Sequence, residues 1–250
     1  MSDPHVNAIN THAQPRMNVK TVTTLAMLTA VAYVVMVLSK MLPSVNGFLD
    51  FDFKDVVICI GGFTFGPMAA FILSTVVAVV EMFTISHTGI IGCIMNVLAT
   101  CSFCCTASFV YKKIHTKKGA VLGLALGVAA LTAVMLLWNY LITPIYQGFP
   151  REVVAAMLVP VFLPFNLAKG GMNMAVTLLL YKPVVTALRK ARLVPESQAP
   201  QKAASGSGVV LNGIPADAVN DRKLNAGFLV FSLALLATFV TLALVLMGII

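Results

Sequence analysis

The chain has 250 residues, of which 59% are hydrophobic and only 10% are charged, and its mean hydropathy is +0.93. A soluble domain carries about a quarter of its residues as charged side chains, so this composition excludes a soluble enzyme, a disordered chain and a disulfide scaffold. The formal net charge of +8 does not indicate nucleic acid, because the basic residues flank apolar runs instead of forming a stripe with aromatic residues. We therefore predict an all-α integral membrane protein embedded in the lipid bilayer.

The apolar runs predict the helices of a membrane domain over residues 21–192, after a polar tail of residues 1–20 that lacks the features of a cleaved signal peptide. A hydrocarbon core about 30 Å thick needs about 20 helical residues. Residues 56–65 are too few to span, and Gly66-Pro67 follows them, which predicts a short second helix and a tight turn. The predicted core helices cover residues 22–41, 56–65, 68–85, 90–111, 120–142 and 158–181.

Two further segments follow the core. Residues 193–223 are polar and rich in Pro, Ser, Gly and Ala, which predicts a flexible cytoplasmic linker. Residues 224–250 carry no charge and predict an additional transmembrane helix, which we expect to be an add-on to the core. Most of the 17 basic residues fall on the side of the amino terminus, so the positive-inside rule places that end in the cytoplasm and the carboxyl end outside. Lys40, Lys54 and Arg151 are expected in or beside external loops.

Lys169 is a basic residue within a predicted span, where an ionisable group is costly unless it is paired, hydrated or functional. Asn166 lies three residues earlier and faces the same way. An amide beside an ammonium can hydrogen-bond a neutral ligand that carries carbonyls and ring nitrogens, which makes both residues candidates for substrate binding. Two alternatives remain for Lys169: its side chain reaches outward to the interface, or it pairs with a carboxylate of the first external loop.

Further candidates lie near the predicted external surface. Asn139 closes the fifth helix, and a buried amide needs partners that a flat polar ligand can supply. The first external loop alternates aromatic and acidic residues, which suggests a lid that includes Asp52 and Phe53. We expect Asp55 to cap the short helix. Gly92 and Asn96 open the fourth helix, where small residues permit close approach of a ligand or of another helix.

A different class of function is an intramembrane enzyme that uses Asp52, Asp55, Glu81 and His87, although their spacing matches no hydrolase motif. The five cysteines lie in apolar segments and predict neither a disulfide framework nor a zinc site. No phosphate-binding loop of the form G-x-x-x-x-G-K-[ST] is present, so any active transport must draw its energy from a partner or a gradient.

The short second helix and five motifs together resemble the riboflavin-specific substrate-binding (S) component of energy-coupling factor transporters. The motifs are Asp52-Phe-Lys-Asp55, Gly62-Phe-Thr-Phe-Gly66-Pro67, Thr88-Gly89 to Asn96, Asn139-Tyr140 to Tyr146, and Pro164-Phe-Asn166-Leu-Ala-Lys169-Gly170. The resemblance runs from about residue 20 to residue 192. Its last two motifs are the specific part, whereas the Gly-Pro turn occurs across vitamin S components.

The resemblance implies a cell-membrane transport protein, not an enzyme, that captures riboflavin from outside; the vitamin is then a transported ligand and no cofactor is implied. It implies that Asn139, Asn166 and Lys169 hold the flavin. It also implies that helix one docks, through Ala26 and Ala30, on a transmembrane coupling protein bound to two ATP-hydrolysing subunits. The extra carboxyl-terminal helix departs from the family pattern.

Three alternatives stay open beside riboflavin. In the first, the ligand is another flat vitamin such as thiamine or biotin. In the second, it is riboflavin phosphate, although one lysine without arginine partners makes a poor phosphate clamp. A third possibility is an assembly protein whose Ala26-x-x-x-Ala30 face matters and whose pocket is empty.

Overall fold

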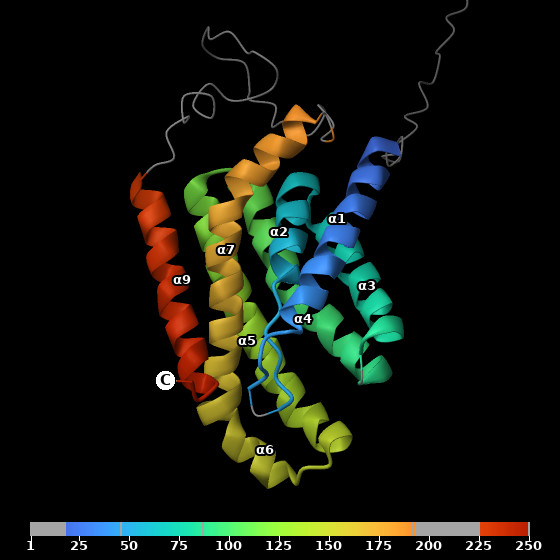
Figure 1. Ribbon diagram of the computed structural model, residues 1–250, viewed down its shortest axis with the longest axis vertical. Helices are drawn as coiled ribbons and strands as arrows, with labels where there is room; N and C mark the ends of the chain where they lie inside the picture. Colours follow the sequence, from blue (N-terminus) through green and yellow to red (C-terminus); the bar gives the residue numbers. More distant parts are fainter. Residues whose placement is uncertain (1–18, 46, 87, 192, 194–225, 250) are drawn as a thin grey trace, which may run out of the picture.

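The computed structural model describes residues 19–45, 47–86, 88–191, 193 and 226–249 (Figure 1). Residues 1–18 of the predicted amino-terminal tail, nearly all of the linker, and His87 lie outside these described residues. Consecutive helices run in opposite directions and form a bundle, except that residues 151–190 form one continuous helical run. Its elements are α1 (Val19–Ser39), α2 (Lys54–Phe65), α3 (Pro67–Thr84), α4 (Gly89–Lys113), α5 (Lys117–Gln147), α6 (Arg151–Met157), the π-helix η1 (Leu158–Phe162), α7 (Leu163–Lys190) and α9 (Ala226–Leu246).

The predicted all-α architecture is confirmed, including the short second helix and the additional last helix. Within the described residues, six helical segments are long and apolar enough to cross a membrane, and α2 is not among them. The turn between α2 and α3 forms as predicted. Gly66 adopts φ +95°, which L side chains rarely tolerate, and Pro67 occupies the first turn of α3, where its missing N–H costs nothing.

The fifth and sixth helices are longer than predicted. α5 begins after Thr116, whose side chain accepts a hydrogen bond from the Gly119 N–H, and ends before Gly148 in the left-handed conformation. Arg151, expected in an external loop, is the first residue of α6. The helix continues through Pro160 because a π-helical segment there absorbs the missing backbone donor, so the break placed before residue 158 was wrong.

The two ends of the bundle differ in charge. The start of α1, the turn between α4 and α5 and the end of α7 lie together at the upper end in Figure 1, which we call the basic end. The opposite end, called the loop end, holds the loop of residues 40–53, the turn between α3 and α4, and α6. The lysines in the described part of the basic end are Lys20, Lys112, Lys113, Lys117, Lys118, Lys182 and Lys190.

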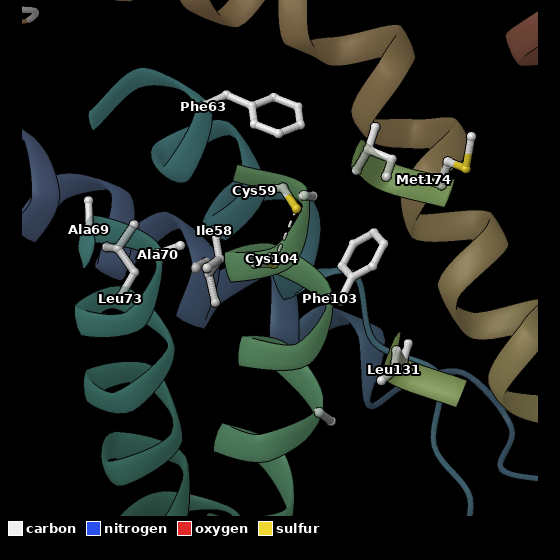
Figure 2. Close-up of a cluster of buried hydrophobic side chains, with 14 of the residues drawn as sticks. Ile58, Cys59, Phe63, Ala69, Ala70, Leu73, Phe103, Cys104, Leu131 and Met174 are labelled. Carbon is white, nitrogen blue, oxygen red and sulfur yellow. Dashed lines mark hydrogen bonds between the residues drawn. The ribbon is translucent and has the colours of Figure 1, made fainter. Parts of the chain in front are cut away.

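The central core packs around α4 and α5. Backbone carbonyls of Ala107 and Phe103 lie so close to Gly123 and Gly127 that an added Cβ would stand 2.7 Å from each, so only glycine permits this approach. Figure 2 shows Cys59 of α2 beside Cys104 of α4 in this cluster, with the Phe103 ring on the other side of α4. All five cysteines are free, and Cys59 and Cys104 serve as buried packing residues.

The last helix packs closely against α7, which its polar linker did not indicate. Its Phe239 ring lies against α7 where a Cβ on Gly171 would be 2.4 Å from the ring carbons. It also joins a second core cluster that unites the loop 40–53, α6, η1 and α7. The linker composition could not reveal this, because the packing depends on apolar faces of α7 and α9 that look alike in a uniformly apolar sequence.

Candidate functional site

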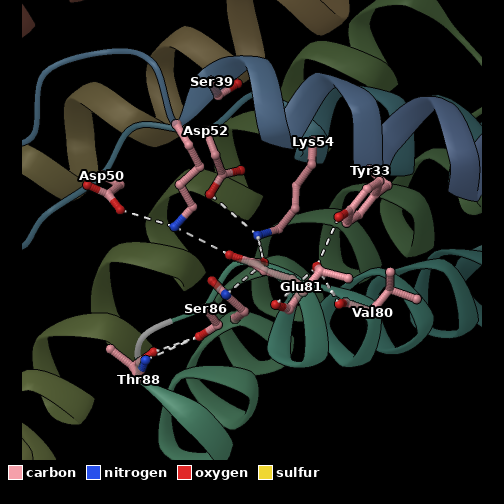
Figure 3. A network of polar contacts seen from close by, with 12 residues as sticks. Tyr33, Ser39, Asp50, Asp52, Lys54, Val80, Glu81, Ser86 and Thr88 are labelled. Carbon is pink, nitrogen blue, oxygen red and sulfur yellow. Dashed lines mark hydrogen bonds and ion pairs between the residues drawn. The ribbon is translucent and has the colours of Figure 1, made fainter.

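Six charged side chains of alternating sign form a continuous chain of ion pairs at the loop end, which we call the ionic chain. Its order is Asp50, Lys40, Glu81, Lys54, Asp52 and Lys169. The chain links the end of α1, the loop, the start of α2, α3 and α7. Figure 3 shows Asp52, Lys54 and Glu81 with their charged ends turned toward one another. Elements far apart in sequence are thus joined at one electrostatically balanced site.

Asp52 is the point where the loop meets α7. Its Oδ2 lies 2.9 Å from Lys169 Nζ and 3.5 Å from Lys54 Nζ, and its backbone carbonyl accepts a hydrogen bond of 3.0 Å from Asn173 Nδ2. Burial alone would raise the pKa of the Asp52 carboxyl, but Lys169 and Lys54 outweigh it and hold that pKa well below its usual range. Asp52 is therefore ionised, and it fixes the Lys169 ammonium.

Lys169 pairs with a loop carboxylate, which is one of the two alternatives that the sequence left open for it. Lys169 stays partly accessible in this contact: 13% of its side chain is exposed, whereas Asp52 is almost fully buried. Beside this contact, Asp52 Oδ1 and Asn173 Oδ1 are buried and lack a hydrogen-bond partner among the described residues. Two unsatisfied acceptors next to an ammonium can receive donor groups of a ligand.

Lys54 and Glu81 are buried, with 3% and 2% of their side chains exposed and 3.2 Å between Lys54 Nζ and Glu81 Oε2. Lys54 flanks the loop as expected, as the first residue of α2, and its side chain turns inward to this pair. Asn96 donates to Glu81 Oε2 at 2.9 Å, which ties the start of α4 to the ionic chain. Because Glu81 is paired with two lysines and an amide, it is not free to act as an acid or base.

Asp55 does not cap α2 through its side chain. The helix begins after Phe53 without a side-chain cap, and Asp55 lies in the first turn. Its Oδ1 instead accepts a 2.7 Å hydrogen bond from Thr100 on α4. Packing of α4 over this end of α2 makes the cross-helix bond available, and a buried carboxylate needs such a partner. His87, the remaining member of the alternative acid-base set, lies outside the described residues.

The amides Asn139 and Asn166 are buried and bonded within their own helices. Asn139 Nδ2 donates to the Met135 carbonyl and its Oδ1 accepts from Thr143. Asn166 Nδ2 donates to the Phe162 carbonyl, within the π-helical segment. The structure brings Lys169 and Asp52 into contact, but no hydrogen bond is formed between these two amides and that pair in the described part of the chain.

An apolar cavity of about 270 Å³ adjoins the ionic chain on the side of α9. Phe53 is among its lining residues, whereas Asn139, Asn166 and Lys169 are not. Gly92 lies beneath the side chain of Thr88, and a Cβ at Gly92 would be only 1.7 Å from Thr88 Oγ1, so glycine there serves close packing. The residues that line the apolar cavity are Leu42, Pro43, Phe51, Phe53, Met172, Val240, Ala243, Leu244, Met247 and Ile249.

Sequence reasoning missed Asn173 and the roles of Lys40 and Lys54. Asn173 follows Lys169 by four residues, so helical spacing places both on one face of α7, and this signal was available. Lys40 and Lys54 share the partner Glu81, which comes from α3 across a contact that no local pattern encodes. Among the described residues, no group of three or more His, Cys, Asp and Glu side chains is arranged to hold a metal ion.

A second surface feature lies on α1. Ala26 and Ala30 are both exposed, and they continue a stripe at four-residue spacing with the exposed residues Val22, Val34 and Leu38. Small side chains at the centre of an apolar stripe let another helix approach closely. The small-residue face noted in the sequence is thus available for a partner.

Comparison with known proteins relates the chain to transport proteins. Residues 20–181 match the family model described as ECF transporter, substrate-specific component. The riboflavin transporter FmnP of Bacillus subtilis is 31% identical over 189 residues, which cover 71% of this chain and 100% of the relative. The riboflavin transporter RibU of Staphylococcus aureus is 30% identical, covering 68% of this chain and 93% of the relative. A solved S component of a bacterial ECF transporter aligns with TM-score 0.59 and 30% identity, over 68% of this chain and 98% of that one.

Proposed function

The chain belongs to the substrate-specific components of ECF transporters, and on that premise we propose that it binds riboflavin outside the cell and carries it across the membrane. The observation that carries this proposal is the similarity, at 30–31% identity, to two riboflavin transporters that are matched over 93–100% of their length. The family consists of transport proteins, so the chain is not an enzyme.

We place the flavin site at the junction of the loop with α4, α5 and α7. Lys169 and Asp52 supply a donor and an acceptor that already face each other at 2.9 Å. Asn139 and Asn166 supply amides whose present partners lie in their own helices, and a change of side-chain rotamer frees them for a ligand. Phe53, Gly92 and Asn96 complete the proposed lining. A flat ring buried among apolar groups, with a few hydrogen bonds, reaches the binding energy of a nanomolar ligand, about 12 kcal/mol.

The basic end of the bundle supports a cytoplasmic amino terminus by the positive-inside rule, which puts the loop end and the carboxyl terminus outside. We further propose that the stripe with Ala26 and Ala30 docks on the transmembrane coupling protein of an energy-coupling module with two ATP-binding subunits. The sequence has no phosphate-binding loop of its own, so a partner must supply ATP hydrolysis.

Purification in detergent tests the proposal. The protein should carry a yellow flavin, or quench the fluorescence of added riboflavin in a saturable way. Asn166→Ala and Lys169→Ala should each weaken this binding at least tenfold, because each removes hydrogen bonds in a water-poor site. Lys118→Ala, exposed at the basic end, is the matched control and should bind as the unmodified protein does. Thiamine and biotin should not compete, and competition by either would favour a different vitamin.

A further inference from the structure

The charge balance of the ionic chain bears on which form of the ligand is accepted. Its three lysines face three carboxylates, so the chain has no excess positive charge. The remaining described charges at the loop end are Asp55, Arg151 and Glu152, which brings this end to four basic and five acidic residues. The +8 net charge of the protein therefore does not originate here.

From this arrangement we propose that Asp52 is a specificity-determining residue, which neutralises Lys169 and thereby makes the site accept uncharged riboflavin and disfavour riboflavin 5′-phosphate. The inference rests on the proposed function and adds the charge of the ligand to it.

The geometry supports a direct role for this one carboxylate. Asp52 Oδ2 is shared by Lys169 at 2.9 Å and Lys54 at 3.5 Å, whereas Lys54 has a second partner in Glu81 at 3.2 Å. Loss of the Asp52 charge would therefore leave Lys54 paired, but it would leave Lys169 without its ion-pair partner and with only the more distant Asp55 carboxyl as an acidic neighbour. Lys169 is also the partly exposed member of the pair and the one that a ligand can reach.

A phosphate group places its own demand on the charges around it. A phosphate ester needs cations in excess of the carboxylates around it, because approach to an ionised carboxylate in a poorly hydrated site is repulsive. The unpartnered Asp52 Oδ1 and Asn173 Oδ1 point to the same preference. Both are acceptors, so they suit ligand hydroxyl or N–H groups and repel phosphate oxygens.

The experiment measures dissociation constants of riboflavin and riboflavin 5′-phosphate by flavin fluorescence quenching on detergent-purified protein. Asp52→Asn should tighten phosphate binding relative to riboflavin by about tenfold or more, because a lone ammonium then faces the ligand. Glu152→Gln removes one exposed negative charge at the same end and should leave the ratio within about twofold, since salt screens exposed charges. Lys169→Met in the Asp52→Asn background should abolish the gain.

An unchanged ratio in Asp52→Asn, or an equal change in Glu152→Gln, would overturn the inference. Should Asp52→Asn fail to fold, the unmodified protein still decides: its affinity for the phosphate should not strengthen as ionic strength falls, and a strong increase would overturn the proposal. If the unmodified protein binds neither flavin, the proposed function itself fails, and that result is distinct from a failure of the charge argument.

Discussion

The buried pair Lys54–Glu81 provides a quantitative test of the ionic chain. Two unit charges 3.2 Å apart attract by about 5 kcal/mol at an effective dielectric constant of about 20, but removing both side chains from water opposes this gain. We expect Lys54→Met and Glu81→Gln each to lower the free energy of unfolding by about 2–4 kcal/mol. After either change, the surviving partner has lost this one contact, although Glu81 still pairs with Lys40 and Lys54 still pairs with Asp52. The second change should therefore cost about 1–3 kcal/mol less than it does alone.

Unfolding of the unmodified protein, the two single variants and the double variant in detergent gives this coupling energy. Glu81→Gln keeps an oxygen for the Asn96 hydrogen bond, so the cycle isolates the charge interaction. Glu152→Gln with Lys118→Met is the matched control, because both residues are exposed and lie at opposite ends of the bundle. Additivity of Lys54→Met and Glu81→Gln within about 0.5 kcal/mol would refute the cooperative ionic chain.

Four other predictions follow from the packing and the charges. Gly171→Ala should lower thermal stability, because its Cβ would stand 2.4 Å from the Phe239 ring, and Phe239→Ala should restore it; failure of this rescue would contradict the packing of α9. Asn173→Ala should increase hydrogen exchange in residues 48–53 by releasing the Asp52 carbonyl, while Thr186→Ala, exposed on the same helix, should not. Ala30→Trp should reduce vitamin uptake by cells and leave riboflavin binding by the purified protein unchanged. Uptake at the normal rate would refute the proposed docking role of the α1 stripe. The folded-state pKa of Asp52 is depressed, so the stability that its charge contributes is lost only as the pH falls below about 4. The difference in stability between the unmodified protein and Asp52→Asn should therefore be the same at pH 7 and pH 5. A difference that shrinks by pH 5 would contradict the ion pair.

Much of the fold could be predicted because hydrocarbon thickness and hydropathy constrain helices directly. Gly66-Pro67 marked the turn after the short α2, and the uncharged last segment marked α9. The start of the sixth helix was placed too late, at residue 158, because a π-helical segment around Pro160 joins α6 to α7. The packing of α9 escaped prediction because lipid-facing and protein-facing apolar side chains look alike in sequence.

The candidate site was predictable in its unusual residues and not in their partners. Lys169 stood out because a lysine is costly in a span, and its contact with Asp52 was one of the alternatives considered. Glu81, Lys54 and Lys40 looked like separate loop and helix-end charges, because their association depends on how α1, α2 and α3 meet. Which groups touch the flavin stays a prediction, and Asn139 and Asn166 are the residues for which a bound state must differ most from the hydrogen bonds described here.

Equilibrium titration of flavin-free protein in lipid nanodiscs with riboflavin tests the central claim most directly. The account predicts saturable quenching of flavin fluorescence at one riboflavin per chain, with a submicromolar dissociation constant that Lys169→Ala weakens and Lys118→Ala does not. Folded protein that leaves riboflavin fluorescence unchanged at micromolar concentration would contradict it.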